Sequence, residues 1–390
     1  MHLYNSLTNN KDLFIPNNHK AVTLYVCGIT PYDTTHLGHA FTYISFDVLV
    51  RYLKYQGYDV IYTQNVTDIN DRDNDILERA KQKNISWKEL AQISTEKFLL
   101  DMKKLNWIMP TDYMKASDNI GPVISLIEKL LKNGLAYEVK GNIYFSIGKD
   151  LEYGKLSKFN HDKMLETASK FGEGIDDVNK KNPLDFTLWK SEGAIPKKHI
   201  PSFDSPFGRG RPGWHIECSA ISTSSLGDQI DIHGGGIDLI YPHHEAEIAQ
   251  SEGALSKKPF VKYWIHTGTI FYEGEKMSKS KGNLVLVSDL LQKYSPNVIR
   301  WLLLSHQHGE NWEFEEKQIK EAEKIFADIN DLISNKKSKN NKENLWKKFN
   351  SFMNNNLDTP GVLKLINDSA KKEDVNFAKK ALEQLGFLLN

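Results

Sequence analysis

The fold is decided by the stretch Val22-Thr-Leu-Tyr-Val-Cys-Gly28 and by the two segments that follow it. Its β-branched and aromatic residues alternate, which is typical of a strand that ends in a turn. Residues 36–56 carry apolar side chains at helical spacing, and residues 58–66 have the composition of a second strand. A strand, a helix and a strand within about 45 residues form a βαβ unit, which predicts a parallel sheet and an α/β fold.

The predicted helix has a signal at each end. Thr34 or Thr35 is the candidate N-cap, because a hydroxyl can accept a hydrogen bond from the first turn. Gly57 is a natural stop at the other end.

The rest of the chain divides by pattern. Helical periodicity runs through residues 75–135 and is mixed with short β-like pieces beyond them, so we interpret residues 110–205 as an insertion. Residues 211–270 are expected to form turns and helices that are dense in His, Gly and acidic residues. From residue 315 the chain is helical and Lys-rich, with a polar break near residues 335–341.

Composition excludes several classes of protein. The chain has 390 residues with 50 Lys and Arg against 50 Asp and Glu, which argues against a polybasic nucleic-acid binder. No apolar run approaches the roughly 18 residues of a membrane helix, and the first residues lack the pattern of a secretory signal. Cys27 and Cys218 are too few for a disulfide framework, which favours a reducing, cytoplasmic setting.

His36, Gly38 and His39 lie between the predicted strand and helix. A helix N-terminus offers unpaired N–H groups and a positive dipole end. The two histidines share one helix face, and the glycine lets a ligand approach closely. Together these features would suit a triphosphate, although an isolated His-x-x-His is more often an ordinary surface or capping pair.

A second candidate phosphate site is the segment Glu275-Lys-Met-Ser-Lys-Ser-Lys-Gly-Asn283. Its lysines, small hydroxyl residues and glycine are typical of a mobile phosphate-binding loop, because lysine serves as a point charge for phosphate. Taken alone, a lysine cluster is usually a solvated loop. The literal Gly-x-Gly-x-x-Gly match at residues 208–213 does not indicate a dinucleotide site, because two prolines precede it where a central strand is required.

Both cysteines can contribute to a metal site. Cys27 ends the first strand, and Cys218 lies in the segment Gly213-Trp-His-Ile-Glu-Cys-Ser219. His243 and Glu247 are four residues apart, on one face of a predicted helix. Two thiolates, an imidazole and a carboxylate make a plausible Zn²⁺ set. Because these residues are scattered, the alternative is two buried cysteines that behave as small hydrophobic residues.

Jointly, the motifs occur in an order that resembles a class I aminoacyl-tRNA synthetase, and within that class a cysteine–tRNA ligase. The resemblance covers about residues 1–310 and weakens beyond Glu315. It is carried by Tyr25-Val-Cys-Gly-Ile-Thr-Pro-Tyr-Asp33, His36-Leu-Gly-His39, Asn65-Val-Thr-Asp-Ile-Asn-Asp71, Gly210-Arg-Pro-Gly-Trp-His-Ile-Glu-Cys-Ser-Ala220, Asp231-Ile-His-Gly-Gly-Gly236, Pro242-His-His-Glu-Ala-Glu-Ile-Ala-Gln250 and Lys276-Met-Ser-Lys-Ser280.

The resemblance implies a class I synthetase fold, in which a Rossmann-type parallel sheet is split by a connective insertion and followed by a short α-helical C-terminal domain. The implied parts are the first half of the catalytic domain, the insertion, the second half with the zinc-site residues, the Lys-Met-Ser-Lys-Ser loop with a stem-contact region, and the helical tail. They span residues 1–109, 110–205, 206–270, 271–314 and 315–390, respectively.

The resemblance also implies ATP-dependent activation of L-cysteine to cysteinyl-adenylate and transfer to the 3′ end of cysteine tRNA. One Zn²⁺ per chain would bind the substrate thiolate, which is a far better zinc ligand than a serine hydroxyl. Because four protein ligands close a zinc site, substrate binding must raise the coordination number or loosen one ligand. Mg²⁺ would accompany ATP.

Individual roles follow from the same resemblance. The implied zinc ligands are Cys27, Cys218, His243 and Glu247; the implied catalytic residues are His36, His39, Lys276 and Lys279; the implied ATP-binding residues are Thr30, Gly38 and Lys279; and the implied residues around cysteine or its adenylate are Gly28, Thr67, Trp214 and Asp238.

Two other functions stay open at this point. The chain has only about 75 residues after Glu315, whereas cysteine–tRNA ligases typically continue into an anticodon-binding segment. A related ligase with a short tail joins cysteine to the amine of a glucosamine–inositol in mycothiol synthesis, although His233 and Glu247 look more like the tRNA ligase. The third candidate is an inactive zinc-binding paralogue, against which the intact His36, His39 and Lys279 argue.

The tail differs in charge from the rest of the chain. Residues 317–390 hold fourteen Lys against ten Asp and Glu, so a mildly basic tail could contact RNA phosphates. We expect the protein to act as a monomer on cysteine, ATP and cysteine tRNA, with no membrane partner.

Overall fold

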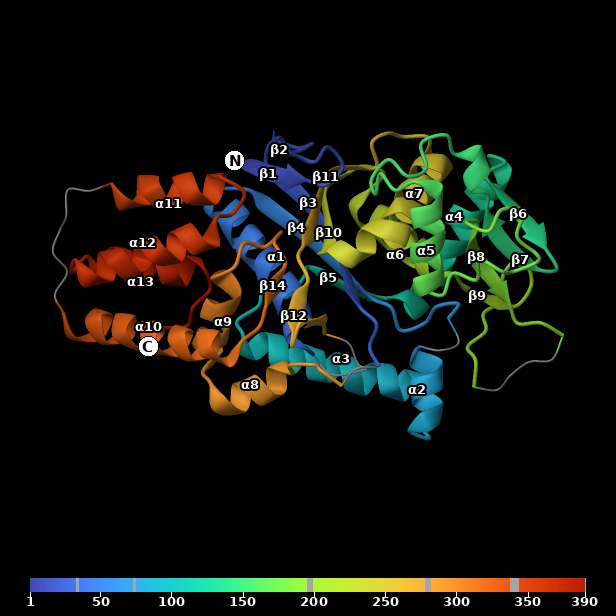
Figure 1. Cartoon of the computed structure of the whole chain (residues 1–390). Coiled ribbons are helices and arrows are strands. Elements are labelled where there is room, and N and C mark those ends of the chain that lie inside the picture. The colour runs from blue at the N-terminus through green and yellow to red at the C-terminus, as the bar shows by residue number, and fades with distance from the viewer. Residues whose placement is uncertain (33–34, 73–74, 195–198, 278–281, 337–343, 390) are drawn as a thin grey trace.

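The computed structural model describes residues 1–32, 35–72, 75–194, 199–277, 282–336 and 344–389. A five-stranded sheet lies at the centre of the molecule (Figure 1). Every neighbouring pair in this sheet runs parallel, which confirms the α/β class predicted from the sequence. In spatial order the strands are β11 (Val261–Thr267), β10 (Ile230–Gly236), β3 (Ala21–Ile29), β4 (Asp59–Val66) and β5 (Asp112–Lys115).

Helices flank the central sheet, and the other strands form smaller sheets. The helices before residue 315 are α1 (Leu37–Tyr55), α2 (Ile76–Gln82), α3 (Trp87–Lys104), α4 (Ile120–Lys132), α5 (His161–Lys170), α6 (Trp214–Leu226), α7 (Glu245–Leu255), α8 (Val287–Lys293) and α9 (Pro296–Leu304). Those after it are α10 (Glu316–Asn335), α11 (Leu345–Asn354), α12 (Thr359–Lys371) and α13 (Val375–Gln384). The other strands are β1 (His2–Asn5), β2 (Asn10–Leu13), β6 (Ala136–Val139), β7 (Asn142–Phe145), β8 (Phe186–Ser191), β9 (Gly210–Pro212), β12 (Ile270–Tyr272), β13 (Glu275–Lys276) and β14 (Trp312–Glu313).

Strand β3 separates two different environments. Its residues Val22, Leu24 and Val26 join the large hydrophobic core that contains α1 and the C-terminal helices. The alternate residues Tyr25 and Cys27 pack with α6 and α7. Because successive side chains of a strand point to opposite faces, one face of β3 builds the core and the other brings a thiol toward α6 and α7.

Helix α1 is capped by His36, the residue before its first residue Leu37, so the prediction of Thr34 or Thr35 as the N-cap is wrong. His36 has an extended backbone, and its Nδ1 accepts a hydrogen bond from the backbone N–H of His39 at 3.4 Å. The imidazole therefore takes the capping role that a hydroxyl would take, while Thr34 lies outside the described residues. At the other end Gly57 follows the helix with a φ of 90°, which confirms the predicted stop.

Residues 211–270 contain two central strands, so the prediction of only turns and helices there is wrong. Strand β10 ends in three glycines, and glycine masks the usual strand signal. A Cβ on Gly234 would lie 2.0 Å from the ring of Phe46 on α1. Only a glycine at this position lets α1 pack so closely against the sheet.

The segment between residues 110 and 205 contributes to two sheets. Strand β5 lies within it but pairs with β4 at the edge of the central sheet, where the sequence predicts helix. Strands β6, β7, β8 and β9 form a separate antiparallel sheet on the side of the molecule away from the C-terminal helices (Figure 1). The limits of the insertion stay a prediction.

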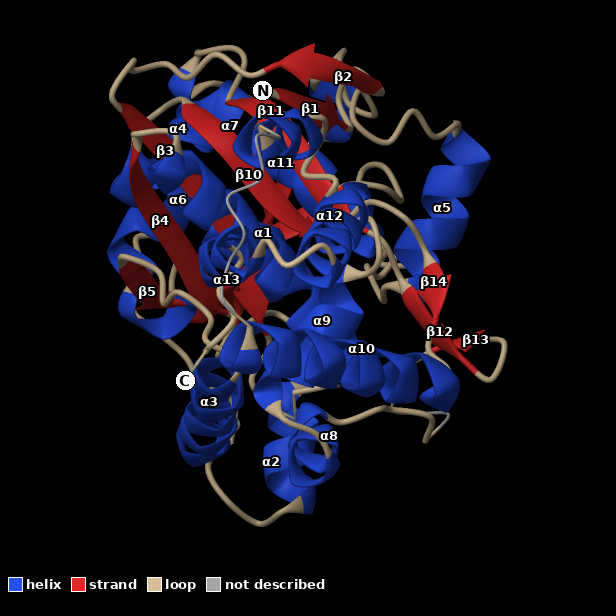
Figure 2. Cartoon of the chain, turned by 90° about the vertical axis from the view of Figure 1, so that its left-hand side faces the viewer, coloured by secondary structure: helices blue, strands red, loops and turns tan. Residues whose placement is uncertain are grey.

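The C-terminal helices pack against α1 and α9 and share one hydrophobic core with them (Figure 2). Arg300 on α9 is buried and pairs with Asp47 on α1. Its guanidinium also donates to the carbonyls of Leu385 at 2.7 Å and Leu105 at 2.9 Å. Because a buried arginine must have partners for its charge and its N–H groups, this cluster fixes the end of the tail against α1.

The described part of the tail is helical, as predicted from its periodicity. Most of the predicted polar break lies in residues 337–343, outside the described residues. Among the helices that the structure describes, none is long and apolar enough to cross a membrane.

Candidate active site and metal centre

A cleft of about 300 Å³ opens at the carboxyl ends of β3, β4 and β10. In open parallel sheets, ligands bind at this edge where the strand order reverses, and β3 lies between β10 and β4 at such a point. The cleft is lined by twelve of the fourteen predicted site residues, namely Cys27, Gly28, Thr30, His36, Gly38, His39, Thr67, Trp214, Cys218, Asp238, His243 and Lys276. Glu247 is fully buried beside Cys27, and Lys279 lies outside the described residues.

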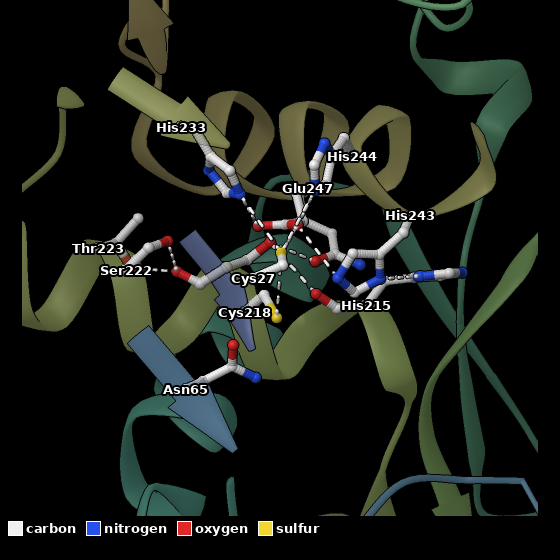
Figure 3. Close-up of polar contacts among 12 residues, drawn as sticks. Cys27, Asn65, His215, Cys218, Ser222, Thr223, His233, His243, His244 and Glu247 are labelled. Atoms are coloured by element: carbon white, nitrogen blue, oxygen red, sulfur yellow. Dashed lines mark hydrogen bonds and ion pairs between the residues drawn. The ribbon is translucent and has the colours of Figure 1, made fainter. Parts of the chain in front are cut away.

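The four predicted metal ligands meet at one end of the cleft (Figure 3). The Sγ atoms of Cys27 and Cys218 are 3.8 Å apart. Oε1 of Glu247 lies 3.5 Å from Cys27 Sγ and 3.2 Å from Nε2 of His243. Strand β3, helix α6 and the start of α7 each supply part of this set, so the scattered sequence positions converge only in the fold.

These separations fit a tetrahedral zinc ion. With Zn–S near 2.3 Å and Zn–N or Zn–O near 2.0 Å, tetrahedral geometry places two sulfurs about 3.8 Å apart, a sulfur and an oxygen about 3.5 Å apart, and a nitrogen and an oxygen about 3.3 Å apart. The observed spacings of 3.8, 3.5 and 3.2 Å follow the same pattern. In addition, Oε2 of Glu247 is buried and has no hydrogen-bond partner among the described residues.

The electrostatics of the cluster also favour a cation. Burial, reinforced by Cys218, raises the pKa of the Cys27 thiol and of the Glu247 carboxyl well above their usual values. Burial, with His215 as the next cause, lowers the pKa of His243 well below its usual value. Burial in the protein alone therefore favours the neutral forms of these groups, and a bound dication would supply the charge that stabilises thiolates and a carboxylate.

A second set of donors overlaps the first. His233 and His244 place Nε2 atoms 3.5 and 3.3 Å from Cys27 Sγ, and they also lie near Glu247. Neither histidine lines the cleft, whereas Cys27, Cys218 and His243 do. Three of the four donors of the first set line the cleft, against one of the second set, so we place the ion that would face a ligand in the first set. Neither His233 nor His244 was assigned as a ligand from the sequence.

Asn65, near the end of β4, forms hydrogen bonds that link the carboxyl ends of β3 and β4. Its Oδ1 accepts from the backbone N–H of Gly28 at 2.7 Å, and its Nδ2 donates to Oγ1 of Thr67 at 3.0 Å. A Cβ on Gly28 would lie 1.6 Å from the carbonyl oxygen of Asn65, so only glycine fits there. This packing places Gly28 and Thr67, two predicted substrate residues, side by side.

Replacing Asn65 by alanine is expected to lower the free energy of unfolding by about 1–3 kcal/mol, because Gly28 loses its buried hydrogen-bond partner. Urea denaturation of Asn65→Ala measures this loss. Asn133→Ala is a matched control, since the Asn133 amide donates only to an exposed carbonyl, that of Gly253. Equal stabilities of the two variants would contradict the role given to Asn65.

The other end of the cleft is formed by the first turn of α1. The imidazole rings of His36 and His39 stack with their centroids 3.7 Å apart, and both line the cleft beside Thr30. A Cβ on Gly38 would lie 3.0 Å from the His36 ring, so the glycine leaves that ring its place. The positive end of the helix dipole and two imidazoles thus face the same space.

Lys276 and Asp238 face each other across the cleft. The Lys276 Nζ lies 2.8 Å from Oδ2 of Asp238, and both side chains are partly exposed. The pair joins β13 to the segment that follows β10. Such an exposed ion pair contributes little to stability. Breaking it to let Lys276 bind a phosphate instead of the Asp238 carboxylate would therefore cost little free energy.

Trp214 forms a wall of the cleft beside the metal cluster. Its ring stacks on His243 with the centroids 4.4 Å apart, and the Arg72 guanidinium lies 3.7 Å above it. The contact with His243 agrees with the position expected one helical turn before Cys218. Arg72, Glu173 and His215, which also surround this corner, were not assigned from the sequence; only His215 had a signal, because it lies inside the motif that contains Trp214 and Cys218.

Comparison with known proteins extends these observations. Residues 13–324 match the family described as the class I (C) tRNA synthetase catalytic domain. The cysteine–tRNA ligase of Thermodesulfovibrio yellowstonii is 40% identical, over 100% of this chain and 85% of that ligase. The cysteine–tRNA ligase of Thermococcus onnurineus is 46% identical, over 85% of this chain and 67% of that ligase.

Solved structures share the fold at lower identity. A Mycobacterium tuberculosis methionyl-tRNA synthetase in complex with methionyl-adenylate superposes with a TM-score of 0.65 at 15% identity, and the match covers 95% of this chain and 86% of that one. The class I synthetase fold predicted from the motifs is therefore confirmed. By its sequence over most of its length, the chain belongs to the cysteine–tRNA ligase family of class I aminoacyl-tRNA synthetases.

Proposed function

We propose that this protein activates L-cysteine with ATP and transfers it to the 3′ end of cysteine tRNA. The observation that carries the proposal is one cleft with two distinct ends. A cluster of two thiols, an imidazole and a carboxylate that could hold a metal ion lies at one end, and a helix N-terminus with two histidines lies at the other. The cysteine–tRNA ligases to which the chain is similar support the same reaction.

Activation joins the cysteine carboxylate to the α-phosphate of ATP. A carboxylate oxygen forms the new P–O bond as the bond to the β-phosphate oxygen breaks and pyrophosphate leaves. The carboxylate is already ionised at neutral pH, so no group has to remove a proton. Catalysis then depends on positioning and on stabilisation of the charge that develops on the phosphates.

We assign that stabilisation to the α1 end of the cleft. His36 and His39 would donate hydrogen bonds to the triphosphate beside the helix N-terminus, with Thr30 and Gly38 forming the surface against which it lies. Lys276 would release Asp238 and turn to the phosphates. Lys279, outside the described residues, stays a predicted partner of the phosphates, which Mg²⁺ would accompany.

Recognition of the amino acid belongs to the opposite end. Zn²⁺, when bound by Cys27, Cys218, His243 and Glu247, would supply a soft ligand site for the substrate thiolate. Trp214 closes the side of this site by stacking on His243. Gly28 and Thr67 lie together along the floor of the cleft, where the substrate's ammonium and carboxylate groups would fit between the two ends.

A metal–sulfur contact would distinguish cysteine from serine more strongly than the size of the binding pocket can. Serine and cysteine differ by one atom, and hydrophobic pockets separate such small differences only by about 1–3 kcal/mol. A thiolate binds zinc far better than a neutral hydroxyl does. We therefore expect accurate selection of cysteine at the activation step.

The transfer step is tested by offering two acceptors to the zinc-loaded protein with cysteine and ATP. One reaction contains transcribed cysteine tRNA, and the other contains the glucosamine–inositol amine. Formation of cysteinyl-tRNA but not of the cysteinyl amide is expected, since the relatives named above are tRNA ligases. Labelling of the amino sugar without charging of the tRNA would overturn the proposed acceptor and leave the activation step intact.

A further inference from the structure

Behind the metal ligand His243 lies a row of buried polar groups that leads into the connective insertion. The Nδ1 atoms of His243 and His215 are 2.9 Å apart. The other ring nitrogen of His215, Nε2, lies 3.2 Å from Oε2 of Glu173. Glu173 follows α5, so it belongs to a different part of the fold from His215 on α6 and from His243 before α7.

The two imidazoles allow one ordering of their protons. If Nε2 of His243 binds the metal, its Nδ1 must carry the hydrogen. That hydrogen is donated to Nδ1 of His215, which must then be an acceptor and must carry its own hydrogen on Nε2. The Nε2–H of His215 in turn needs an acceptor. In the structure this nitrogen makes no hydrogen bond of good geometry, and the carboxylate of Glu173, with Oε2 3.2 Å away, is the acceptor that it faces.

Glu173 is held in place for this task. Its other oxygen, Oε1, accepts from the Arg72 guanidinium at 2.7 Å, and Arg72 is itself stacked on Trp214. Burial alone would raise the pKa of Glu173, but its charged and hydrogen-bonding partners, Arg72 among them, outweigh the burial and lower that pKa. Glu173 is therefore an acceptor throughout the neutral range, with one oxygen bonded to Arg72 and the other facing His215.

We propose that Glu173, carried by the connective insertion, is a positioning residue for the metal centre, which fixes the tautomer and ring orientation of His243 through His215. Metal-bound histidines usually donate their second N–H to a carboxylate or a carbonyl. Here a second histidine extends that link by one residue. The inference rests on the metal assignment of the proposed function, and it makes the insertion part of the amino-acid site.

The test measures zinc affinity in the absence of cysteine and ATP. Zn²⁺ dissociation constants are determined by competition with a chromogenic chelator for the wild type, Glu173→Gln and Glu173→Ala. Removal of an outer partner of a metal-bound histidine typically weakens binding about 10- to 100-fold, and we expect a loss in this range for Glu173→Ala. Glu166→Gln is the matched control, because Glu166 lies in the same insertion but pairs only with exposed lysines.

A double-mutant cycle separates this role from a general structural one. In a His215→Ala background, Glu173→Ala is expected to have no further effect on zinc affinity, because the link is already broken. The visible spectrum of the Co²⁺-substituted protein should change in Glu173→Ala and stay unchanged in Glu166→Gln. Glu173→Gln provides a near-isosteric variant should Glu173→Ala fail to fold.

Several results would overturn the inference. Zinc affinities of Glu173→Ala and Glu173→Gln within twofold of the wild type would do so, and so would an equal effect of Glu173→Ala with and without His215. Both outcomes leave cysteine activation by the wild-type protein untouched, so they are distinguishable from a failure of the proposed function. A wild-type protein that binds no zinc would overturn both.

Discussion

Cysteine-dependent ATP–pyrophosphate exchange is expected to fall by more than about 100-fold when Cys218 is replaced by serine. Loss of a group that only supports a metal ligand already costs 10- to 100-fold, and Cys218 is proposed as a ligand itself. A neutral hydroxyl in its place keeps the size of the side chain but removes one soft donor from a set whose sulfurs are 3.8 Å apart. Zinc content, measured by elemental analysis, should fall together with exchange.

The control for this experiment is Ser224→Ala, an exposed substitution on the same helix as Cys218. It should keep both zinc and activity. Preserved discrimination between cysteine and serine in Cys218→Ser would contradict recognition through the metal, whatever the total rate. The same reasoning applies to His243→Ala, whose imidazole faces Glu247 at 3.2 Å.

The second large effect is expected at the opposite end of the cleft. Replacing His39 by alanine removes a donor aimed at the developing charge, and removal of one such donor typically lowers the rate about 10²- to 10³-fold. Zinc content should not change, because His39 lies at the α1 end of the cleft and belongs to neither set of metal donors. Exchange kinetics and elemental analysis on the same preparation measure both quantities.

His19→Ala is the matched control, because His19 is an exposed histidine before β3 and outside the cleft. It should exchange at the wild-type rate. If His39→Ala also kept the wild-type rate, the phosphate end of the cleft would be wrongly assigned. Loss of zinc in His39→Ala would instead indicate a general disturbance of the fold.

The parts of the fold that sequence predicts well are those with local signals. The β3–α1–β4 unit combines an alternating strand, a helical period and a glycine stop within one short stretch, so each element supports the others. Strand β10 is not predicted from the sequence, because its glycines carry no side-chain pattern. At least one of these glycines is required by tertiary packing, because Gly234 leaves space for the ring of Phe46 on α1. Strand β5 is not predicted because its four residues at a sheet edge, two exposed and two partly buried, give too short a pattern.

The candidate site also contains residues that the sequence predicts and residues that only the structure reveals. Cys27, Cys218, His243 and Glu247 could be selected because few residue types bind zinc, and the fold then brings them together. Glu173 could not be selected, because a glutamate in a glycine-rich loop has no periodic or chemical signal of its own. Its proposed role depends on its position 3.2 Å from Nε2 of His215, which lies on another segment of the chain, and only the folded structure shows that contact.

The N-cap of α1 has a local sequence signal, and that signal selects the wrong residue. The sequence rules for caps favour hydroxyl and carboxamide residues, so they select Thr34 or Thr35. The structure uses His36 instead, and its Nδ1 accepts from the backbone N–H of His39 at 3.4 Å. A residue that was predicted only for phosphate binding therefore also builds the local structure that presents it.

The most direct measurement is ATP–pyrophosphate exchange by the zinc-loaded wild-type protein, with cysteine and serine compared at equal concentrations. We expect exchange that depends on cysteine, is negligible with serine, and disappears when a chelator removes the metal. Absence of cysteine-dependent exchange in protein that contains one zinc per chain would contradict the proposed function. Equal exchange with serine would contradict recognition of the substrate thiolate by the metal centre.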